Sequence, residues 1–423
     1  MIIDYPALYA SVFALLFLLR VLYVLALSLL GLWSRVVAFT LRSLVYPRLP
    51  IWVAETRLDL LVFLLVVVAN GLCCVLGVSG VDGFHSRIGK VTLANLTLLS
   101  LGGRVTAVSN FLGLGCKHTK LIHRWVAIIV VVEGGLHGLL AFLGHRTKIF
   151  TQLQIIYALL PFASLIACFI FLPLKTSLYE LFLVIHNALA LTCLVAIWLH
   201  LWRYVRERDV FVIVSLVLTL VLLCCQPLGV IYRNFPFRQR FHRLSVFKQN
   251  DALILKLHIQ RPWGFRAGQY VYLCVPAASP FASFEFHPFF IAWWERTANG
   301  EAIAHFLVQP RFGFTRDLLR CLSYETTADV RSTSSCTAFI EGPYGITHHL
   351  SDYGTIILLA SGIGICAQLP YIQQAVADHK ARKVKTQKIE LHWILEKESQ
   401  QDWVKSWMDE ILEADAKYVR IEI

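Results

Sequence analysis

The sequence predicts a multi-domain protein: an all-α transmembrane bundle, then a small β-barrel, then an incomplete α/β domain. Hydrophobic residues make up 57% of the 423 residues and charged residues 16%, with a mean hydropathy of +0.62. Soluble domains carry about 25% charged residues. Residues 1–228 hold 17 Lys and Arg against 8 Asp and Glu, whereas residues 229–423 hold 22 against 19. An apolar, basic first part points to a lipid bilayer and not to nucleic acid, and the second part has the composition of a soluble protein.

Seven apolar stretches are long enough to cross a bilayer, which takes about 20 residues each. They cover 8–31, 58–78, 86–103, 121–143, 152–172, 179–202 and 210–227. The third is the least apolar, because Thr92, Asn95 and Thr97 interrupt it. We therefore expect a multi-pass membrane protein with about seven helices in residues 1–228.

The distribution of positive charge predicts the orientation in the membrane. With the soluble part inside, the inner loops and the segment after the last span hold 13 Lys and Arg, against 7 in the outer loops. Cytoplasmic loops are enriched in Lys and Arg. The internal loops alone are nearly balanced, at 8 against 7. We expect a cytosolic C-terminal part.

Two of the spans carry histidine pairs with the same spacing: His123 with His137, and His186 with His200. Fourteen helical residues return to within about 40° of the starting direction and rise about 21 Å, so each pair lies on one face with one His near each membrane surface. Two such helices can pair His123 with His186 and His137 with His200. Each pair can bind one flat macrocycle through both axial positions of its iron, which suits electron transfer. The pattern predicts two b-type haems; the alternative is that these are ordinary interior polar groups.

Two charges near these histidines have more than one interpretation. Arg124 could meet a haem propionate or anchor the helix at the membrane edge. Glu133 lies one turn before His137, so it could tune the outer haem, relay a proton, or hydrogen-bond a neighbouring helix.

The soluble part begins with short strands and turn signals, which favour a small barrel over residues 229–345. The expected strands are 244–249, 252–259, 269–275, 287–294, 303–309 and 336–341. Gly313 and Thr315 precede a helical run at 316–322, where free backbone N–H groups suit a pyrophosphate, although Thr is also an ordinary N-cap.

Residues 346–423 follow a strand, glycine turn and helix pattern. A buried parallel-type strand at 355–360 leads through Gly362 and Gly364 into a helix at 366–379. This arrangement lets the backbone approach a dinucleotide pyrophosphate. A strand at 388–394, a helix at 400–412 and a strand at 418–423 follow, so the sheet has only three strands and is incomplete.

The paired histidines and the soluble motifs together resemble the ferric reductase and NADPH oxidase superfamily, in particular fungal ferric-chelate reductases. The resemblance implies a transmembrane haem bundle, a ferredoxin-reductase-like FAD β-barrel and a partial NAD(P)-binding α/β domain. It implies that NADPH or NADH binds at Gly362 and Gly364. The residues implied for FAD are His287, Pro288, Phe289, Ile291, Gly313, Thr315, Gly342, Pro343, Tyr344 and Gly345.

The chain departs from the family pattern in three places, one of which is Ser361, where the family usually has the first of two adjacent glycines in the nucleotide turn. The family has Thr or Ser after its His-Pro-Phe motif, where this chain has Phe290, so one expected hydrogen bond to the flavin is missing. The family also continues to a C-terminal segment with a Cys and a Gly near the nicotinamide. We expect either a fragment or shortened product, or a protein without a working hydride site.

The resemblance implies a reductase that passes electrons from cytosolic NAD(P)H through FAD and two haems to ferric or cupric chelates, or siderophores, outside the cell. It implies a plasma-membrane location, although a vacuolar membrane stays open, and an iron permease or oxidase as partner. The sequence assigns no catalytic residue and no oligomeric state. Basic residues of the outer loops could attract anionic chelates: Arg146, Lys148, Arg203, Arg206 and Arg208. The alternatives are an NADPH oxidase that forms superoxide and an inactive haem-binding membrane protein.

Overall fold

The structure is a computed structural model of the chain. It describes residues 20, 29, 32–102, 106–144, 152–235, 241–278, 286–297, 300–311, 313–325, 335–415 and 420–422. The expected first span, 8–31, therefore lies outside the described residues apart from two positions. The chain forms two compact units: residues 1–99 with 121–216, and residues 100–120 with 217–423.

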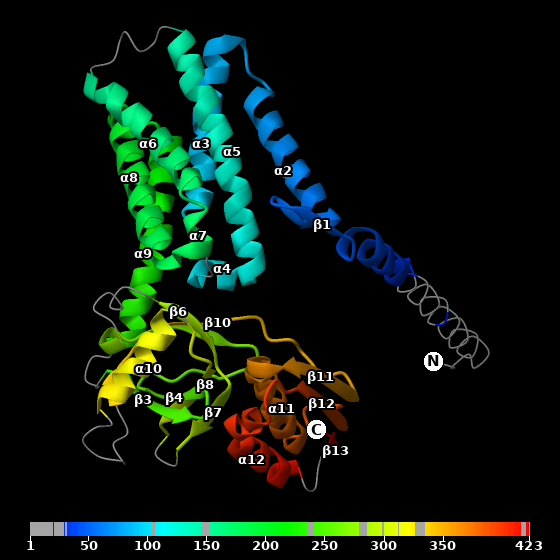
Figure 1. Ribbon diagram of the computed structural model, residues 1–423. Coiled ribbons are helices and arrows are strands. Elements are labelled where there is room, and N and C mark those ends of the chain that lie inside the picture. The colour runs from blue at the N-terminus through cyan, green and yellow to red at the C-terminus, as the bar shows by residue number, and fades with distance from the viewer. Residues whose placement is uncertain are drawn as a thin grey trace, which may run out of the picture. The chain divides into compact units, whose positions relative to one another are not determined.

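The first unit is helical (Figure 1). A short π-helical turn, Leu41–Val45, and the strands β1 (Arg48–Ile51) and β2 (Ala54–Thr56) precede it. Its helices are α2 (Arg57–Val75), α3 (Gly80–Leu99), α5 (Cys116–Leu143), α6 (Gln152–Ile170), α7 (Leu174–Ser177), α8 (Tyr179–Arg206) and the start of α9 (Val210–Asn234). Five of them, α2, α5, α6, α8 and α9, are long and apolar enough to cross a membrane.

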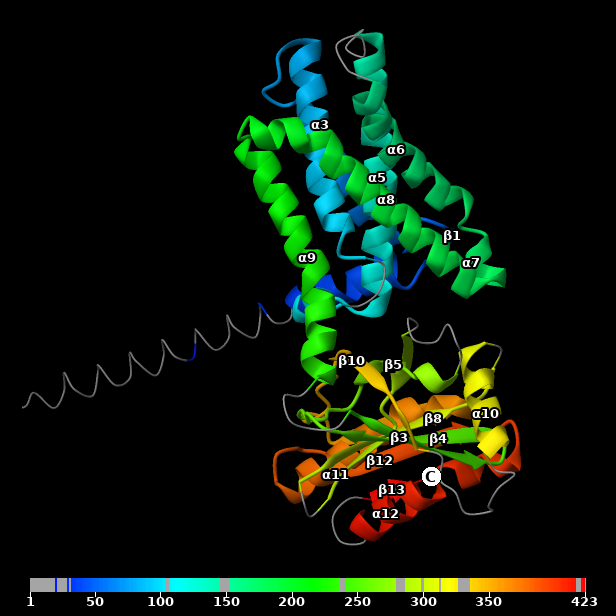
Figure 2. The ribbon, with the colours of Figure 1, turned by 90° about the vertical axis from the view of Figure 1, so that its left-hand side faces the viewer.

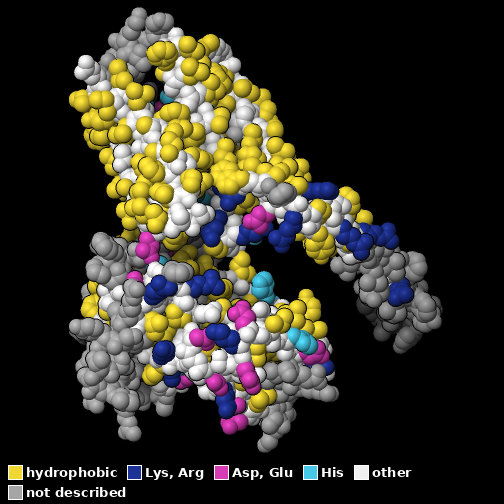
Figure 3. Space-filling view, viewed as in Figure 1, with side chains coloured by type: hydrophobic (Ala, Val, Ile, Leu, Met, Phe, Trp, Pro, Cys, Tyr) yellow, Lys and Arg dark blue, Asp and Glu magenta, His cyan; other side chains and the backbone are white. Residues whose placement is uncertain are grey.

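The surface of these helices is apolar, as expected for a protein whose solvent is lipid. Hydrophobic side chains cover the helical unit (Figure 3), and on α2 Leu61, Leu65 and Val68 are all exposed. A bilayer replaces water around such helices. The multi-pass prediction is confirmed.

Helix α3 explains why the third expected span is the least apolar. It is long enough to cross a bilayer, but its polar residues Thr92, Asn95 and Thr97 are buried inside the unit. The Thr92 and Thr97 hydroxyls donate to carbonyls one turn earlier in α3, at 2.8 and 3.1 Å. The helix therefore turns a polar face inward.

The second unit contains the short helix α4 (Ala107–Phe111) and then two antiparallel sheets. One sheet has the order β7-β8-β4-β3-β9 and the other β10-β5-β6. The strands are β3 (Arg243–Gln249), β4 (Ala252–Ile259), β5 (Tyr270–Cys274), β6 (His287–Phe290), β7 (Trp293–Arg296), β8 (Ala302–Val308), β9 (Ser335–Thr337) and β10 (Phe339–Tyr344), with α10 (Phe314–Glu325) between β8 and β9. Their inner faces form one apolar core around Leu255, Leu273 and Phe306.

The expected closed barrel is only partly confirmed. The strands form where they are predicted, but the described strands make two sheets and no closed one. The expected strand 287–294 is two strands, because the chain leaves one sheet after Phe290 and joins the other at Trp293.

The C-terminal strands are parallel, in the order β11 (Thr355–Ser361), β12 (Lys388–Ile394) and β13 (Arg420–Glu422) (Figure 1); β12 and β13 are also labelled in Figure 2. Helices α11 (Ile365–Lys380) and α12 (Lys405–Asp415) follow the first two strands. The predicted parallel strand at 355–360 is confirmed, but it is buried on one face only. Ile356 and Leu358 are buried, but Ile357 and Leu359 are 60% and 68% exposed. The described helices cover one face of this sheet.

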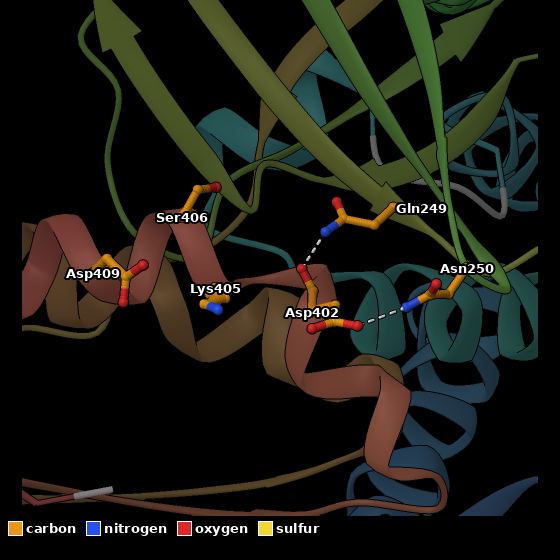
Figure 4. A pocket seen from close by; sticks show the side chains of 6 residues that line it. All are labelled: Gln249, Asn250, Asp402, Lys405, Ser406 and Asp409. Atoms are coloured by element: carbon orange, nitrogen blue, oxygen red, sulfur yellow. Dashed lines mark hydrogen bonds between the residues drawn. The ribbon is translucent and has the colours of Figure 1, made fainter.

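A polar junction joins the β3–β4 turn to the segment before α12 (Figure 4). The Gln249 side chain donates to the Asp402 carbonyl, and Asn250 Nδ2 donates to Asp402 Oδ2 at 3.0 Å. Asp251 accepts from Trp403 Nε1 and from Lys397 Nζ, each at 3.1 Å. These bonds fix the first sheet against the parallel one.

Candidate functional site

One histidine pair, His123 on α5 and His186 on α8, lies between these two helices. The ring centroids of His123 and His186 are 6.1 Å apart, with planes at 65°. Two metal–nitrogen bonds of about 2 Å, plus about 1 Å from each nitrogen to its ring centre, give about 6 Å for imidazoles on opposite sides of one metal. Each Nδ1 is buried without a hydrogen-bond partner among the described residues. The separation and the donor set fit bis-axial ligation of one iron.

The second pair has a different environment, because helix α3 contacts His137. His137 Nδ1 lies 3.1 Å from the carbonyl oxygen of His85, and the two rings stack with centroids 4.2 Å apart at 15°. A carbonyl only accepts, so Nδ1 carries the proton of this hydrogen bond. In a neutral ring this leaves the lone pair of Nε2 free to bind a metal. His200 lies on α8, the helix that also carries His186.

Gly89 makes this approach possible. A Cβ at Gly89 would lie 2.8 Å from His137 Cε1 and 3.0 Å from its Nδ1, closer than side chains approach. We call the surface formed by the His85 carbonyl and Gly89 the α3 cradle. Sequence reasoning missed both residues; their spacing of one helical turn, inside a polar span, was the available signal.

A largely buried chain of polar side chains connects α2, α3 and α5. Asn95 Nδ2 donates to Glu133 Oε2 at 2.9 Å and to Asn70 Oδ1 at 2.8 Å. Of the interpretations left open for Glu133, the hydrogen bond to a neighbouring helix is the one observed. Arg124 donates to the carbonyl of Trp52 and lies 5.0 Å from the centre of its ring. These contacts favour the anchoring role for Arg124.

The flavin motif lies on β6, beside β5 and α10. His287 stacks on Phe314, with centroids 4.3 Å apart, and Phe289 lies 6.1 Å from the same ring. Pro288 pairs with Tyr272 across the two strands. Ile291 is in the hydrophobic core, and its N–H donates to Gln269 O at 3.1 Å. The motif therefore offers a flat aromatic wall, but the side chain of Ile291 serves packing.

Tyr270 lies on the other face of this sheet, because it pairs with Phe290 while Phe289 pairs with the core residue Val271. Its hydroxyl is buried beside Tyr272 and makes no hydrogen bond of good geometry among the residues that the structure describes. Burial raises the pKa of Tyr270, so it stays a neutral donor. Phe290, opposite Tyr270 in the ladder, is 47% exposed. A flavin ring with acceptor atoms would satisfy the Tyr270 hydroxyl.

The segment from Gly342 to Gly345, which the resemblance implies for FAD, passes very close to the turn at residues 266–270. A Cβ at Gly345 would lie 2.3 Å from Gly268 O, and Gly345 has a φ of +119°. The Gly345 N–H donates to Asn110 Oδ1 at 3.1 Å. Tyr344 donates to the buried Glu341 at 2.9 Å, and the Gly342–Pro343 peptide is cis. The loop therefore needs glycine for its path.

The Gly313 and Thr315 region begins α10, as expected. Gly313 has a φ of +78°, and its carbonyl accepts from the N–H groups of Arg316 and Asp317. The Thr315 hydroxyl accepts from the Arg311 N–H at 2.7 Å. The hydroxyl thus stabilises the preceding loop, and its role toward a phosphate stays a prediction.

The expected glycine turn connects β11 to α11. Gly362 has a φ of +47°, and its carbonyl accepts from Trp393 Nε1 at 2.9 Å. A Cβ at Gly364 would meet none of the described atoms within 4 Å, so the turn borders open space at the start of α11. This geometry suits a pyrophosphate at a helix N-terminus. Burial raises the pKa of the Cys366 thiol to about 11, which keeps it neutral.

Two families of known domains match the soluble part of the chain. Residues 238–348 match the FAD-binding domain family, and residues 353–423 match the ferric reductase NAD binding domain family. A probable cell surface ferric reductase, kap2, from Aspergillus oryzae is 23% identical over 353 residues, covering 75% of this chain and 44% of its own length. Ferric reductase transmembrane component 1 from Schizosaccharomyces pombe is 25% identical over 308 residues, covering 62% and 51%.

A plant protein of a different description is also similar. A respiratory burst oxidase homolog, protein G, from Arabidopsis thaliana is 23% identical over 216 residues, which cover 43% of this chain and 24% of that protein. The chain spans about half the length of the two fungal relatives. The resemblance inferred from the paired histidines and the soluble motifs is confirmed.

Proposed function

We propose that this chain is a transmembrane oxidoreductase. Its soluble part carries the FAD-binding and ferric reductase NAD-binding domains of the ferric reductase and NADPH oxidase superfamily. It passes electrons from cytosolic NAD(P)H to a ferric or cupric chelate on the other side of the membrane. The match to both domains and the five membrane-crossing helices support this proposal.

The chain's own residues hold and orient the cofactors. When bound, FAD would accept a hydride and release single electrons, and two b-type haems would carry these through the bilayer. His123 and His186 would hold the inner iron, and His137 and His200 the outer one. The Tyr270 hydroxyl and the exposed Phe290 ring beside it would position the flavin.

The single observation that carries the proposal is the inner histidine pair. Two imidazoles from different helices face each other at a centroid separation of 6.1 Å, and both have buried, unpartnered Nδ1 atoms among the described residues. Most buried side-chain nitrogens in proteins have a hydrogen-bond partner. Across the described residues, no cluster of three or more His, Cys, Asp or Glu forms. A two-ligand site suits haem, because the macrocycle supplies the remaining ligands.

The experiment is an acceptor assay on membranes that contain the full protein. NADH or NADPH is supplied on the side of the soluble part, and ferrous iron and superoxide are measured in parallel. We expect ferrous iron to form with the wild type and with the control His349→Ala, an exposed histidine. We expect His186→Ala to abolish it. Equal rates in His186→Ala and the control would refute the proposal.

A second candidate is a superoxide-forming oxidase. The similarity to the plant respiratory burst oxidase homolog favours it, because the two classes share the motifs described above. The same assay separates them: superoxide without direct ferrous iron formation would identify the oxidase. An inactive haem-binding protein would give neither product. For the reductase we propose a plasma-membrane location with a cytosolic soluble part.

A further inference from the structure

The glycine turn has a carboxylate beside it. Strands β11 and β12 are parallel, and their last paired residues are Ser361 and Ile394, so both end at the same edge of the sheet. Glu396 follows β12 by two residues. A Cβ built on Gly362 would lie 3.3 Å from Glu396 Oε1. The turn and the carboxylate therefore border one site.

The end of β12 is fixed in this position. Trp393 Nε1 donates to Gly362 O at 2.9 Å, and the Glu396 N–H donates to Gln400 Oε1 at 3.0 Å. The first bond links the strand end to the glycine turn, and the second fixes the backbone of the loop. Glu396 therefore has a defined place relative to the turn.

The neighbouring cation does not offset this carboxylate. Lys397 is the only Lys or Arg in residues 361–366 and 395–400. Its Nζ is 3.1 Å from Asp251 Oδ2, while Asp251 Oδ1 accepts from Trp403. Lys397 thus already has an anionic partner on another strand pair.

These positions bear on which dinucleotide can bind. A dinucleotide with its pyrophosphate on the glycine turn places its adenosine ribose near the end of the neighbouring strand. An acidic side chain there accepts a hydrogen bond from a free ribose 2′-hydroxyl, whereas a 2′-phosphate requires a cation. A phosphate monoester carries a charge of about −1.5 to −2 at neutral pH. Beside Glu396 it would meet repulsion.

We propose that Glu396 makes this a site for NADH, the dinucleotide with a free 2′-hydroxyl, and excludes NADPH. The inference rests on the proposed function and names its electron donor. Glu396 is a specificity-determining residue, and it leaves the hydride chemistry itself unchanged.

The test uses the full chain in detergent and two probes without nicotinamide, ADP-ribose and 2′-phospho-ADP-ribose, in calorimetric titrations. We expect the wild type to bind ADP-ribose at least about tenfold more tightly, because one unfavourable charge contact of 1.4 kcal/mol gives that ratio. Glu396→Gln should reduce the preference and Glu396→Arg should reverse it. The control Glu398→Gln, an exposed carboxylate two residues away, should keep the wild-type ratio.

The outcomes separate the two proposals. Equal or tighter binding of the 2′-phosphorylated probe by the wild type, no binding of either probe, or an unchanged ratio in Glu396→Gln would overturn the assignment of Glu396. Haem reduction by NADPH as fast as by NADH would also overturn it, while leaving the reductase function intact. Selective binding of ADP-ribose without any electron transfer would support Glu396 and refute the reductase.

Discussion

Replacing Gly89 by Ala tests whether the α3 cradle positions His137. The added Cβ would lie 2.8 Å from His137 Cε1, whereas carbon atoms prefer separations of about 3.5–4.0 Å. The ring must therefore move by roughly 1 Å. Overpacking costs about 1–3 kcal/mol and loss of the bond to the His85 carbonyl about 1 kcal/mol. The higher helix propensity of Ala offsets about 1 kcal/mol of this destabilisation.

The net cost of about 1–3 kcal/mol corresponds to a roughly fivefold to 150-fold weaker hold on the outer haem. We expect the haem-to-protein ratio of Gly89→Ala to fall from two toward one. In molecules that retain both haems, the outer potential should rise, because a ligand histidine that loses its Nδ1 hydrogen bond becomes less basic. Potentiometric titration with haem quantification measures both.

The matched control is Gly71→Ala on α2, where a Cβ would meet none of the described atoms within 4 Å. It should keep the wild-type haem ratio and both potentials. If Gly89→Ala and Gly71→Ala behave alike in both measurements, the cradle does not position His137.

Three further changes have expected outcomes. Gly345→Ala should lower the free energy of unfolding by about 3 kcal/mol or more and release FAD, because it combines a strained φ with a backbone clash. The control Gly354→Ala, where a Cβ has open space, should retain the flavin. Equal flavin content in the two variants would contradict this prediction. Burial lowers the pKa of His242 from 6.5, so the stability that the neutral ring provides is complete above pH 6.5 and is lost as the pH falls toward the folded-state pKa. Thermal unfolding between pH 8 and 5 should show this loss, and His242→Asn should flatten it; an equally steep profile in the variant would argue against it. Changing the exposed Arg206 and Arg208 to Ala should raise the KM for anionic chelates more than for neutral acceptors, and equal changes would remove their steering role.

The sequence was informative wherever one local signal determines structure. Continuous apolar runs located five spans, because backbone groups in lipid must bond within a helix. The strand 388–394 was predicted with its observed bounds, because its alternating pattern and flanking polar residues agree. The equal spacing of the histidines placed His123 and His186 on facing helices, since helical geometry alone fixes the direction of side chains.

The remaining features depend on contacts between distant segments. The spacing of Gly89 from His85 does not by itself identify Gly89, because its role depends on a ring 48 positions later in the chain. The break between Phe290 and Trp293 arises because the residues before it pair with β5 in one sheet and the residues after it pair with β8 in the other. The exposed face of β11 could not be anticipated, because strand composition does not tell which helices cover a sheet.

The most direct test of the account is a reduced-minus-oxidised absorption spectrum of the purified full chain, combined with a haem-to-protein ratio. We predict a low-spin b-type spectrum, a ratio near two, and a lower ratio when any one of His123, His137, His186 or His200 is changed to Ala. A wild-type protein that purifies folded, with its flavin but without haem, would contradict the account.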